Sequence, residues 1–122
     1  MFGKKKSAAR QQADQRVYEL HEQAQFLCYI NEAYREPNGD VMCMKLEGIV
    51  AKGTGTLQDR YQLYDCRGRW KAEITMEELY LGQDSVTSLQ GGDKRVALYP
   101  REQEVSYMAG DLLCIICGDE SG

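Results

Sequence analysis

The sequence predicts a mainly β protein, a small antiparallel β-barrel preceded by one N-terminal helix. Three observations lead to this fold class: about six short strand-like runs, turn signals between them about every 8–12 residues, and one long segment of helical periodicity. A chain of 122 residues with 43% apolar residues can form one compact domain with a core. We expect residues 1–6 to be a disordered basic start and residues 119–122 a frayed tail.

Residues 7–36 are predicted to form the N-terminal helix. Apolar residues from Val17 to Leu27 recur three and four positions apart, which places them on one helical face. Good helix formers dominate the segment, and Pro, Asn and Gly at 37–39 end it. The run Phe26–Ile30 has an alternative as a first strand. The apolar stripe predicts either docking on the barrel or binding to a partner or a second copy.

Residues 37–118 are predicted to form the barrel. Val41–Ala51 alternates between two faces with a period of two, which is typical of a half-buried strand. Tyr61–Cys66 and Trp70–Ile74 flank a short charged turn and predict a hairpin. The apolar run Leu112–Cys117 fits a last strand that is paired on both sides.

The segment between these strands predicts a short helix and a second hairpin. Thr75–Glu78 matches a capping box, so we expect a helix over Met76–Leu81. Val86–Leu89 and Lys94–Tyr99 flank a turn at Gln90–Asp93, which indicates that the two runs pair with each other.

The tripeptide Gly53-Thr54-Gly55 raises the question of a phosphate-binding loop. Such a loop needs a following helix whose N-terminus faces the anion, and the Walker pattern ends in Gly-Lys-Ser or Gly-Lys-Thr. Neither feature is present in the sequence. Glycine beside strands commonly supplies a bulge or a barrel corner, because it adopts a positive φ without a Cβ clash. We therefore predict a corner.

Two short pieces, Gly48–Gly55 and Ala109–Leu113, resemble domain 2 of elongation factor Tu and related translation GTPases. The resemblance extends over about Val41–Cys117. It implies a small β-barrel of similar shape. In that family the barrel accompanies a GTP-binding domain, which this sequence does not contain, so GTP hydrolysis is not implied. Because these factors contact ribosomal or transfer RNA, the resemblance implies RNA binding as a second function.

Charge is distributed unevenly along the chain. Residues 1–16 carry a net charge of +4 and the remainder carries −8. An acidic body argues against broad nucleic-acid binding, which needs a basic surface. There is no apolar run of about 18–20 residues, no secretory signal after the basic start, and three lysines do not anchor a protein stably to a membrane. We expect a soluble, bacterial, cytoplasmic protein without stable membrane association.

No catalytic pattern stands out, and we expect neither an enzyme nor a cofactor. The single histidine, His21, lies among Glu and Gln in the predicted helix, which is typical of a solvated residue. The nucleophile motifs of hydrolases and β-lactamases are missing. The acidic pair Glu77-Glu78 is explained by helix capping.

Five cysteines and no export signal predict reduced thiols. Cys114 and Cys117 have the spacing of a metal knuckle and are the least unlikely metal ligands. The run around them predicts a buried strand, on which residues three apart face opposite sides. We therefore expect the two cysteines to be buried structural thiols. A zinc or redox site is the third hypothesis for the function of the protein.

One basic and aromatic cluster stands out in the body of the protein. It consists of Arg60, Arg67, Arg69, Trp70 and Lys71. Bases stack on tryptophan and phosphates pair with arginine, so these residues are the candidate contact for single-stranded RNA. The alternative is a charged hairpin tip with Trp70 packed in the core.

Tyrosine is abundant, with eight residues in the chain. Tyr61, Tyr64, Tyr80, Tyr99 and Tyr107 fall in or beside predicted strands, where some could form an exposed recognition patch. The leading hypothesis is therefore a non-enzymatic module that binds an unknown protein partner through its helix or its tyrosine-rich barrel face. Contact with RNA or the ribosome is the alternative.

Overall fold

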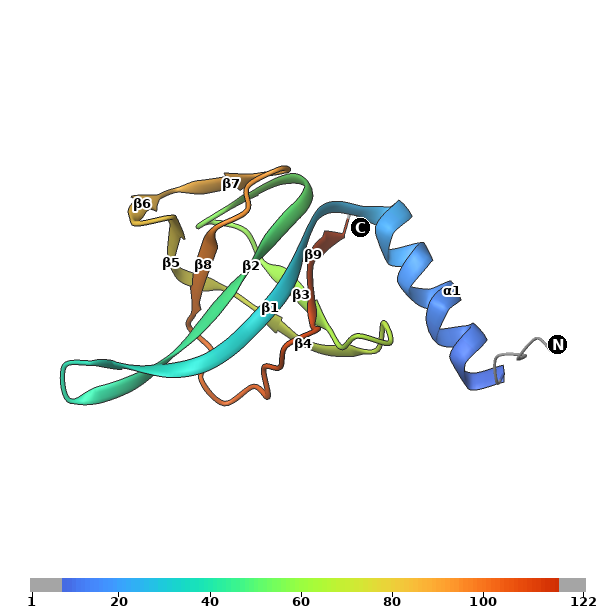
Figure 1. The fold of residues 1–122 in the computed structure, drawn as a ribbon, viewed down its shortest axis with the longest axis horizontal. Helices are drawn as coiled ribbons and strands as arrows, with labels where there is room; N and C mark the ends of the chain where they lie inside the picture. Colours follow the sequence, from blue (N-terminus) through green and yellow to red (C-terminus); the bar gives the residue numbers. More distant parts are fainter. Residues whose placement is uncertain (1–7, 117–122) are drawn as a thin grey trace, which may run out of the picture.

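The computed structural model describes residues 8–116, which form one N-terminal helix and nine strands (Figure 1). Their bounds, in chain order, are α1 Ala8–Gln23, β1 Ala24–Asn38, β2 Val41–Thr56, β3 Tyr61–Tyr64, β4 Trp70–Ile74, β5 Met76–Leu81, β6 Asp84–Val86, β7 Ser88–Gln90, β8 Val96–Pro100 and β9 Leu112–Ile116. The predicted mainly β class with one N-terminal helix is confirmed. The predicted disordered start at 1–6 and frayed tail at 119–122 lie outside the described residues.

The strands form one curled antiparallel sheet. Its order is β4-β3-β9-β1-β2-β8-β5-β6, and β7 pairs with the far end of β2. β4 pairs with β3 and β5 pairs with β8, yet only Thr75 separates β4 from β5 in the chain. Chain continuity at Thr75 therefore brings β4, at one edge of the sheet, next to β5, the second strand from the other edge, and no hydrogen-bonded ladder joins the two among the described residues. The sheet is barrel-like in this sense.

The prediction of a helix over 7–36 is wrong beyond Gln23, where β1 begins. The alternative, in which Phe26–Ile30 is a first strand, is confirmed. The side chains of Phe26 and Cys28 point into the main core, whereas Leu27 packs under α1. Because both faces of this strand are buried, its apolar run is continuous and the period of two is hidden.

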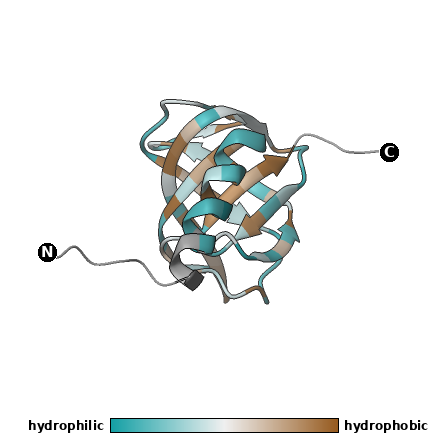
Figure 2. Cartoon of the chain, turned by 90° about the vertical axis from the view of Figure 1, so that its right-hand side faces the viewer, coloured by the Kyte–Doolittle hydropathy of each residue, from teal (hydrophilic) through white to brown (hydrophobic). Residues whose placement is uncertain are grey.

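Two apolar clusters hold the fold together. The main core lies inside the curled sheet and includes Phe26, Ile30, Leu46, Val50, Tyr61, Leu63, Ile74, Met76, Leu79, Leu98 and Leu113. The second lies between α1 and the outer surface of β1, β9 and β3, and includes Leu20, Ala24, Leu27, Tyr64, Leu112 and Cys114. Burying Leu20 completely contributes roughly 2 kcal/mol to this docking. The outward surface of α1 is largely hydrophilic (Figure 2).

The predicted helix over Met76–Leu81 is wrong, because this segment is strand β5. Met76 and Leu79 are buried, and a register irregularity between Met76 and Glu78 allows both to face the core. The threonine of the capping box has another partner: the Thr75 N–H and hydroxyl both donate to the Glu102 carboxylate at 2.9 Å.

The predicted pairing of Val86–Leu89 with Lys94–Tyr99 is also wrong. β7 pairs with Thr54–Thr56 of β2, and β8 pairs with Leu46–Gly48 of the same strand. The turn between them is as predicted, since the Asp93 N–H donates to the Gln90 carbonyl at 3.0 Å. The turn residues were therefore sufficient to locate the reversal, but not the pairing partner.

The glycine corner is confirmed at Gly53. Its φ is +79°, and a Cβ there would collide with the backbone of Gln25 on the neighbouring strand. The β1–β2 register shifts beside it, between Leu27 and Cys28. The tripeptide thus bends a strand that continues to Thr56, and the next element in the chain is another strand, β3.

Candidate functional site

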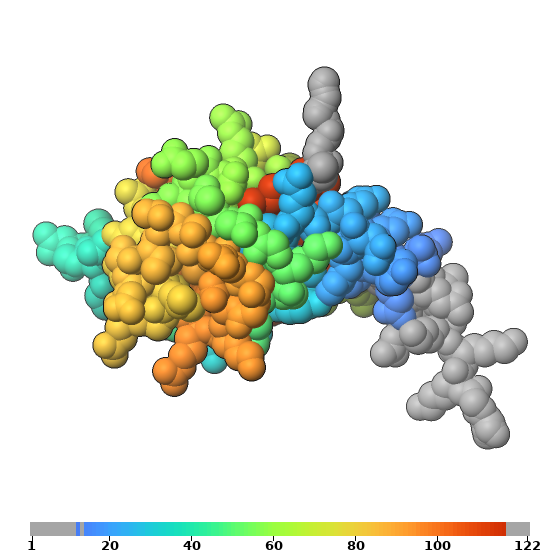
Figure 3. Space-filling model, turned by 90° about the horizontal axis from the view of Figure 1, so that it is seen from above, coloured from blue at the N-terminus to red at the C-terminus, as the bar shows by residue number. Residues whose placement is uncertain are grey.

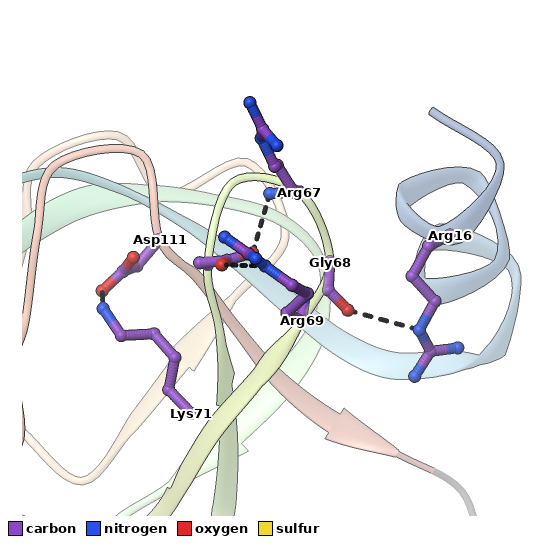
Figure 4. Close-up of polar contacts among 7 residues, drawn as sticks. Arg16, Arg67, Gly68, Arg69, Lys71 and Asp111 are labelled. Carbon is purple, nitrogen blue, oxygen red and sulfur yellow. Dashed lines mark hydrogen bonds and ion pairs between the residues drawn. The ribbon is translucent and has the colours of Figure 1, made fainter. Parts of the chain in front are cut away.

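The basic and aromatic cluster predicted from the sequence lies on and beside the β3–β4 hairpin, and Figure 4 shows three of its members, Arg67, Arg69 and Lys71. Two of its arginines are paired with neighbouring acids. Arg60 contacts Glu73 at 3.1 Å, and Arg69 contacts Asp65 at 2.8 Å. The Asp65 carboxylate also accepts the backbone N–H groups of the turn, so it organises the hairpin tip. These charges are largely compensated within the hairpin itself.

Lys71 belongs to the fold rather than to an exposed surface. Its ammonium group lies 2.8 Å from the Asp111 carboxylate, and the two side chains are 18% and 3% exposed. The same Asp111 oxygen accepts the Met108 N–H at 2.9 Å. Because buried charges require partners, this pair joins the start of β4 to the turn before β9.

Trp70 is 59% exposed, so the alternative that packs Trp70 in the core is wrong. Its indole N–H donates to Gln62 at 2.7 Å, which holds the ring on the outer surface of the hairpin. Arg67 is exposed as well, and no ion pair of its side chain is found within the described residues. Of the five predicted residues, the structure therefore leaves Trp70 and Arg67 as candidate contacts.

A second aromatic surface lies on the outside of the sheet, across β1, β2, β8 and β5. We name it the tyrosine face and define it by Tyr34, Lys45, Tyr80 and Tyr99. The Lys45 ammonium lies 5.9 Å from the ring centroids of both Tyr34 and Tyr99. The rings of Tyr80 and Tyr99 meet edge to face at 5.7 Å. Such contacts hold large side chains in one arrangement without burying them.

Each tyrosine hydroxyl of this face donates to a carboxylate. The pairs are Tyr34 with Glu47 at 2.7 Å, Tyr99 with Glu36 at 2.7 Å and Tyr80 with Glu78 at 2.8 Å. Partial burial, followed by the bond to Glu36, raises the pKa of Tyr99 to about 12. The Tyr99 hydroxyl is therefore a proton donor throughout the physiological pH range.

Beyond its ladder with β8, the β1–β2 hairpin projects past the rest of the sheet as an arm, which we define as residues 34–45. Its tip and α1 lie at opposite ends of the molecule (Figures 1 and 3). Val41 and Met42 near the tip are 61% and 50% exposed. A strongly exposed apolar pair on a projecting element is a candidate contact for another molecule.

A groove of about 850 Å³ lies between the arm and the ends of β5 and β8. We name it the arm groove. It is lined by Glu36, Pro37, Asn38, Val41, Met42, Cys43, Met44, Glu77, Glu78, Tyr80, Tyr99, Pro100, Arg101 and Gln103. Two residues of the tyrosine face, Tyr80 and Tyr99, thus form part of its wall. The lining combines aromatic, thioether, thiol and carboxylate groups, which is a surface suited to binding.

The tyrosines expected in a patch divide between two environments. Tyr61, Tyr64 and Tyr107 are buried, whereas Tyr80 and Tyr99 lie on the tyrosine face. Tyr34 was missed, because it falls in the segment predicted as helix. The run Glu32–Asn38 carries no clear period of two, so the sequence offered no signal for the position of Tyr34.

The cysteine and histidine predictions have different outcomes. Cys114 is fully buried in the cluster under α1, and Cys117 lies outside the described residues. Within residues 8–116, no group of three His, Cys, Asp or Glu is placed to hold a metal ion. His21 is not simply solvated: its Nε2 lies 2.6 Å from the Tyr29 hydroxyl, because α1 docks on this part of β1. No helix in the described part of the chain is long and apolar enough to cross a bilayer.

The fold is a curled antiparallel β domain with one N-terminal helix, and comparison with known proteins bears on this fold. No protein-family model and no curated protein sequence matches the chain. Among solved structures, it is similar to the apo form of translation elongation factor SelB from Methanococcus maripaludis, with a TM-score of 0.56 and 15% identity. The similarity covers 73% of this chain and 18% of that factor. It shows the fold alone, and it agrees with the translation-factor-like barrel implied by the sequence resemblance.

Proposed function

We propose that this chain is a non-enzymatic interaction module that binds another protein through the arm groove and the adjoining tyrosine face. One observation carries the proposal: a groove of about 850 Å³ under a projecting arm, with tyrosines in its wall and an exposed methionine at its rim. Tyrosine and methionine are enriched in protein–protein interfaces, and tyrosine buries a large area at a small entropic cost.

Site-directed photo-cross-linking of the full chain tests this function. A photoreactive amino acid at Met42, on the rim of the groove, is expected to give a discrete protein adduct in cells of the source organism. The same amino acid at Tyr18, which is 62% exposed on α1, is the matched control. Adducts that form at Tyr18 but not at Met42, or that persist unchanged after Tyr80→Ala, would contradict the proposal.

RNA contact through Trp70 and Arg67 is a second candidate function. Two observations favour it: the indole of Trp70 is exposed beside the arginine-bearing turn, and the structural neighbour is named as a translation elongation factor. Trp70 is the single tryptophan of the chain, so stacking of a base on it would quench the whole tryptophan emission.

Titration with single-stranded RNA therefore tests the second function directly. We expect quenching that is reversed by raising the salt concentration and abolished by Arg67→Ala combined with Arg69→Ala. Emission that does not change at low salt would exclude a contact at Trp70.

A further inference from the structure

The arm groove coincides with the place where β8 leaves β2. The ladder between the two strands comprises Leu46–Gly48 and Val96–Leu98, and β8 ends at Pro100. The following residue, Arg101, donates its N–H to the Thr75 carbonyl at 2.9 Å and so follows the β4–β5 corner. Beyond this point β2 continues towards the arm tip, and its pairing in that stretch is with β1.

A side chain takes the place of the missing strand at Met44. The Met44 N–H donates to the Gln103 side-chain carbonyl at 2.8 Å, and the Gln103 amide donates to the Pro100 carbonyl at 2.6 Å. Pro100 has no N–H to offer β2, which explains why the ladder stops there. The Met44 amide therefore faces the groove side of β2.

The next amide on the same edge is that of Met42, since backbone groups alternate with a period of two. Met42 lies opposite Pro37 in the β1–β2 register. Because proline has no N–H, Pro37 cannot donate to Met42. This agrees with a non-hydrogen-bonded pair, in which the backbone groups of the two residues point away from each other. The N–H and C=O of Met42 are thus directed to the open edge, beside the groove.

The groove has an excess of negative charge. Its lining contains Glu36, Glu77 and Glu78 against Arg101, and Lys45 beside the groove lies 3.5 Å from Glu36, so three acids face two cations. Arg101 contacts Glu77 through one oxygen, Oε1, and Tyr80 contacts Glu78 through Oε1 as well. A ligand that carries positive charges is complementary to this lining.

We propose that the arm groove binds an extended, basic peptide segment of a partner protein, which adds as a strand beside Met42 along the line that β8 vacates. The inference rests on the proposed function and names the chemistry of the partner. Backbone hydrogen bonds to Met42 supply the register, and alternate side chains reach Glu77 and Glu78 on one side. The side chains of opposite alternation pack on Met42, whose side chain lies on the other face of β2.

The test is a nuclear magnetic resonance titration of the full chain with a nine-residue peptide that alternates lysine and valine. We expect the amide signals of Val41–Met44 and the side-chain signals of Gln103 to shift, while those of α1 do not. A twin peptide with glutamate in place of lysine is expected to bind at least tenfold more weakly. Shifts centred on Trp70, or equal binding of the acidic twin, would overturn the proposal.

Two further comparisons separate strand addition from simple charge attraction. The basic peptide with N-methylated alternate amides is expected to bind about tenfold more weakly, because it cannot donate along the strand. Met42→Pro removes the N–H on the open edge without removing a β1–β2 ladder bond, and the same loss is expected. Equal binding in both cases would mean that no strand is added.

Charge is tested by Glu77→Gln combined with Glu78→Gln, for which we expect about fivefold weaker binding of the basic peptide. The matched control is Glu22→Gln combined with Asp84→Asn, which removes the same charge from exposed positions on α1 and β6. An equal loss in the control would reduce the effect to net charge and overturn the site.

A synthetic peptide of residues 1–10 that outcompetes the lysine–valine peptide would assign the groove to a second copy instead.

Failure here is distinguishable from failure of the proposed function. If cross-linking at Met42 captures a partner while none of the peptides binds, the interaction module stands and the strand-addition inference is wrong. If neither experiment gives a signal at the arm, both are wrong.

Discussion

The β3–β4 hairpin and the tyrosine face both combine aromatic rings with charges, but they differ in where their partners come from. On the hairpin, Arg60 and Arg69 are paired with acids of the same hairpin. On the tyrosine face, Lys45 of β2 lies between Tyr34 of β1 and Tyr99 of β8. The basic residues of the hairpin, which are close together in the sequence, are thus neutralised by acids of the same hairpin. The tyrosine face, which is assembled from four strands, lies on the outside of the sheet beside the arm groove.

The largest change in stability is expected at Asp111, because the Lys71–Asp111 pair is partly buried and stabilises the fold. Asp111→Ala leaves the Lys71 ammonium without its partner and the Met108 N–H without its acceptor. We expect a loss of about 3 kcal/mol in the free energy of unfolding, measured by urea denaturation. Lys71→Met combined with Asp111→Asn is the control, with a smaller expected loss. A change below about 0.5 kcal/mol for Asp111→Ala would show that Lys71 is available for ligands.

The next effect is expected on the tyrosine face. Tyr99→Phe removes the hydroxyl that donates to Glu36 and keeps the ring that contacts Lys45. We expect a loss of about 1 kcal/mol in unfolding free energy, the ordinary value for one hydrogen bond to a charged group that retains a second partner. Trp70→Phe is the matched aromatic control, with little change expected. Equal losses would remove the distinction between an organised face and an exposed ring.

A smaller effect is expected in the pH dependence of stability. The folded-state pKa of Tyr99 is raised to about 12 from an ordinary value of 10.0. Because the neutral hydroxyl is the form stabilised by folding, this contribution is present below pH 10 and is lost as the pH rises towards 12. Thermal unfolding between these two values should depend less steeply on pH in Tyr99→Phe than in the parent chain. An unchanged slope would show that the hydroxyl is not held by the fold.

The smallest effect is expected for the exposed pair of the hairpin. Arg60→Ala should leave the thermal midpoint unchanged, because Arg60 and Glu73 are both well exposed and water replaces their contact. If the midpoint falls by several degrees, the charges of this hairpin stabilise the fold and the contrast with the Lys71–Asp111 pair is lost.

Local sequence signals were sufficient for several features of this protein. The alternation in Val41–Ala51, the turn at Gln90–Asp93 and the corner at Gly53 all lie where the pattern predicted them. Each of these features depends on residues adjacent in the chain. Burial of one face of a strand makes apolar residues recur with a period of two, and a turn or a positive φ favours glycine, asparagine and aspartate. The mainly β class follows from the sum of such signals.

Predictions failed where a segment is buried on both sides or where its partner is distant in sequence. Phe26–Ile30 contacts the main core with one face and α1 with the other, so its period was hidden. Thr75 is bonded to Glu102 rather than to Glu78, because β5 lies in the sheet. Of the predicted RNA contact, Trp70 and Arg67 are exposed, whereas Lys71 is held by Asp111, a partner 40 positions away that the sequence pattern did not reveal.

By itself, then, the sequence determined the class of the fold, the start of the helix, the principal turns and the acidic character of the body. Only the tertiary structure decided which strands are neighbours, which charges are compensated and where a groove is left open. The physical reason is that periodicity and turn chemistry are properties of a few consecutive residues. The end of β8 at Pro100, and with it the open edge of the arm, arises from contacts among segments that are far apart in the chain.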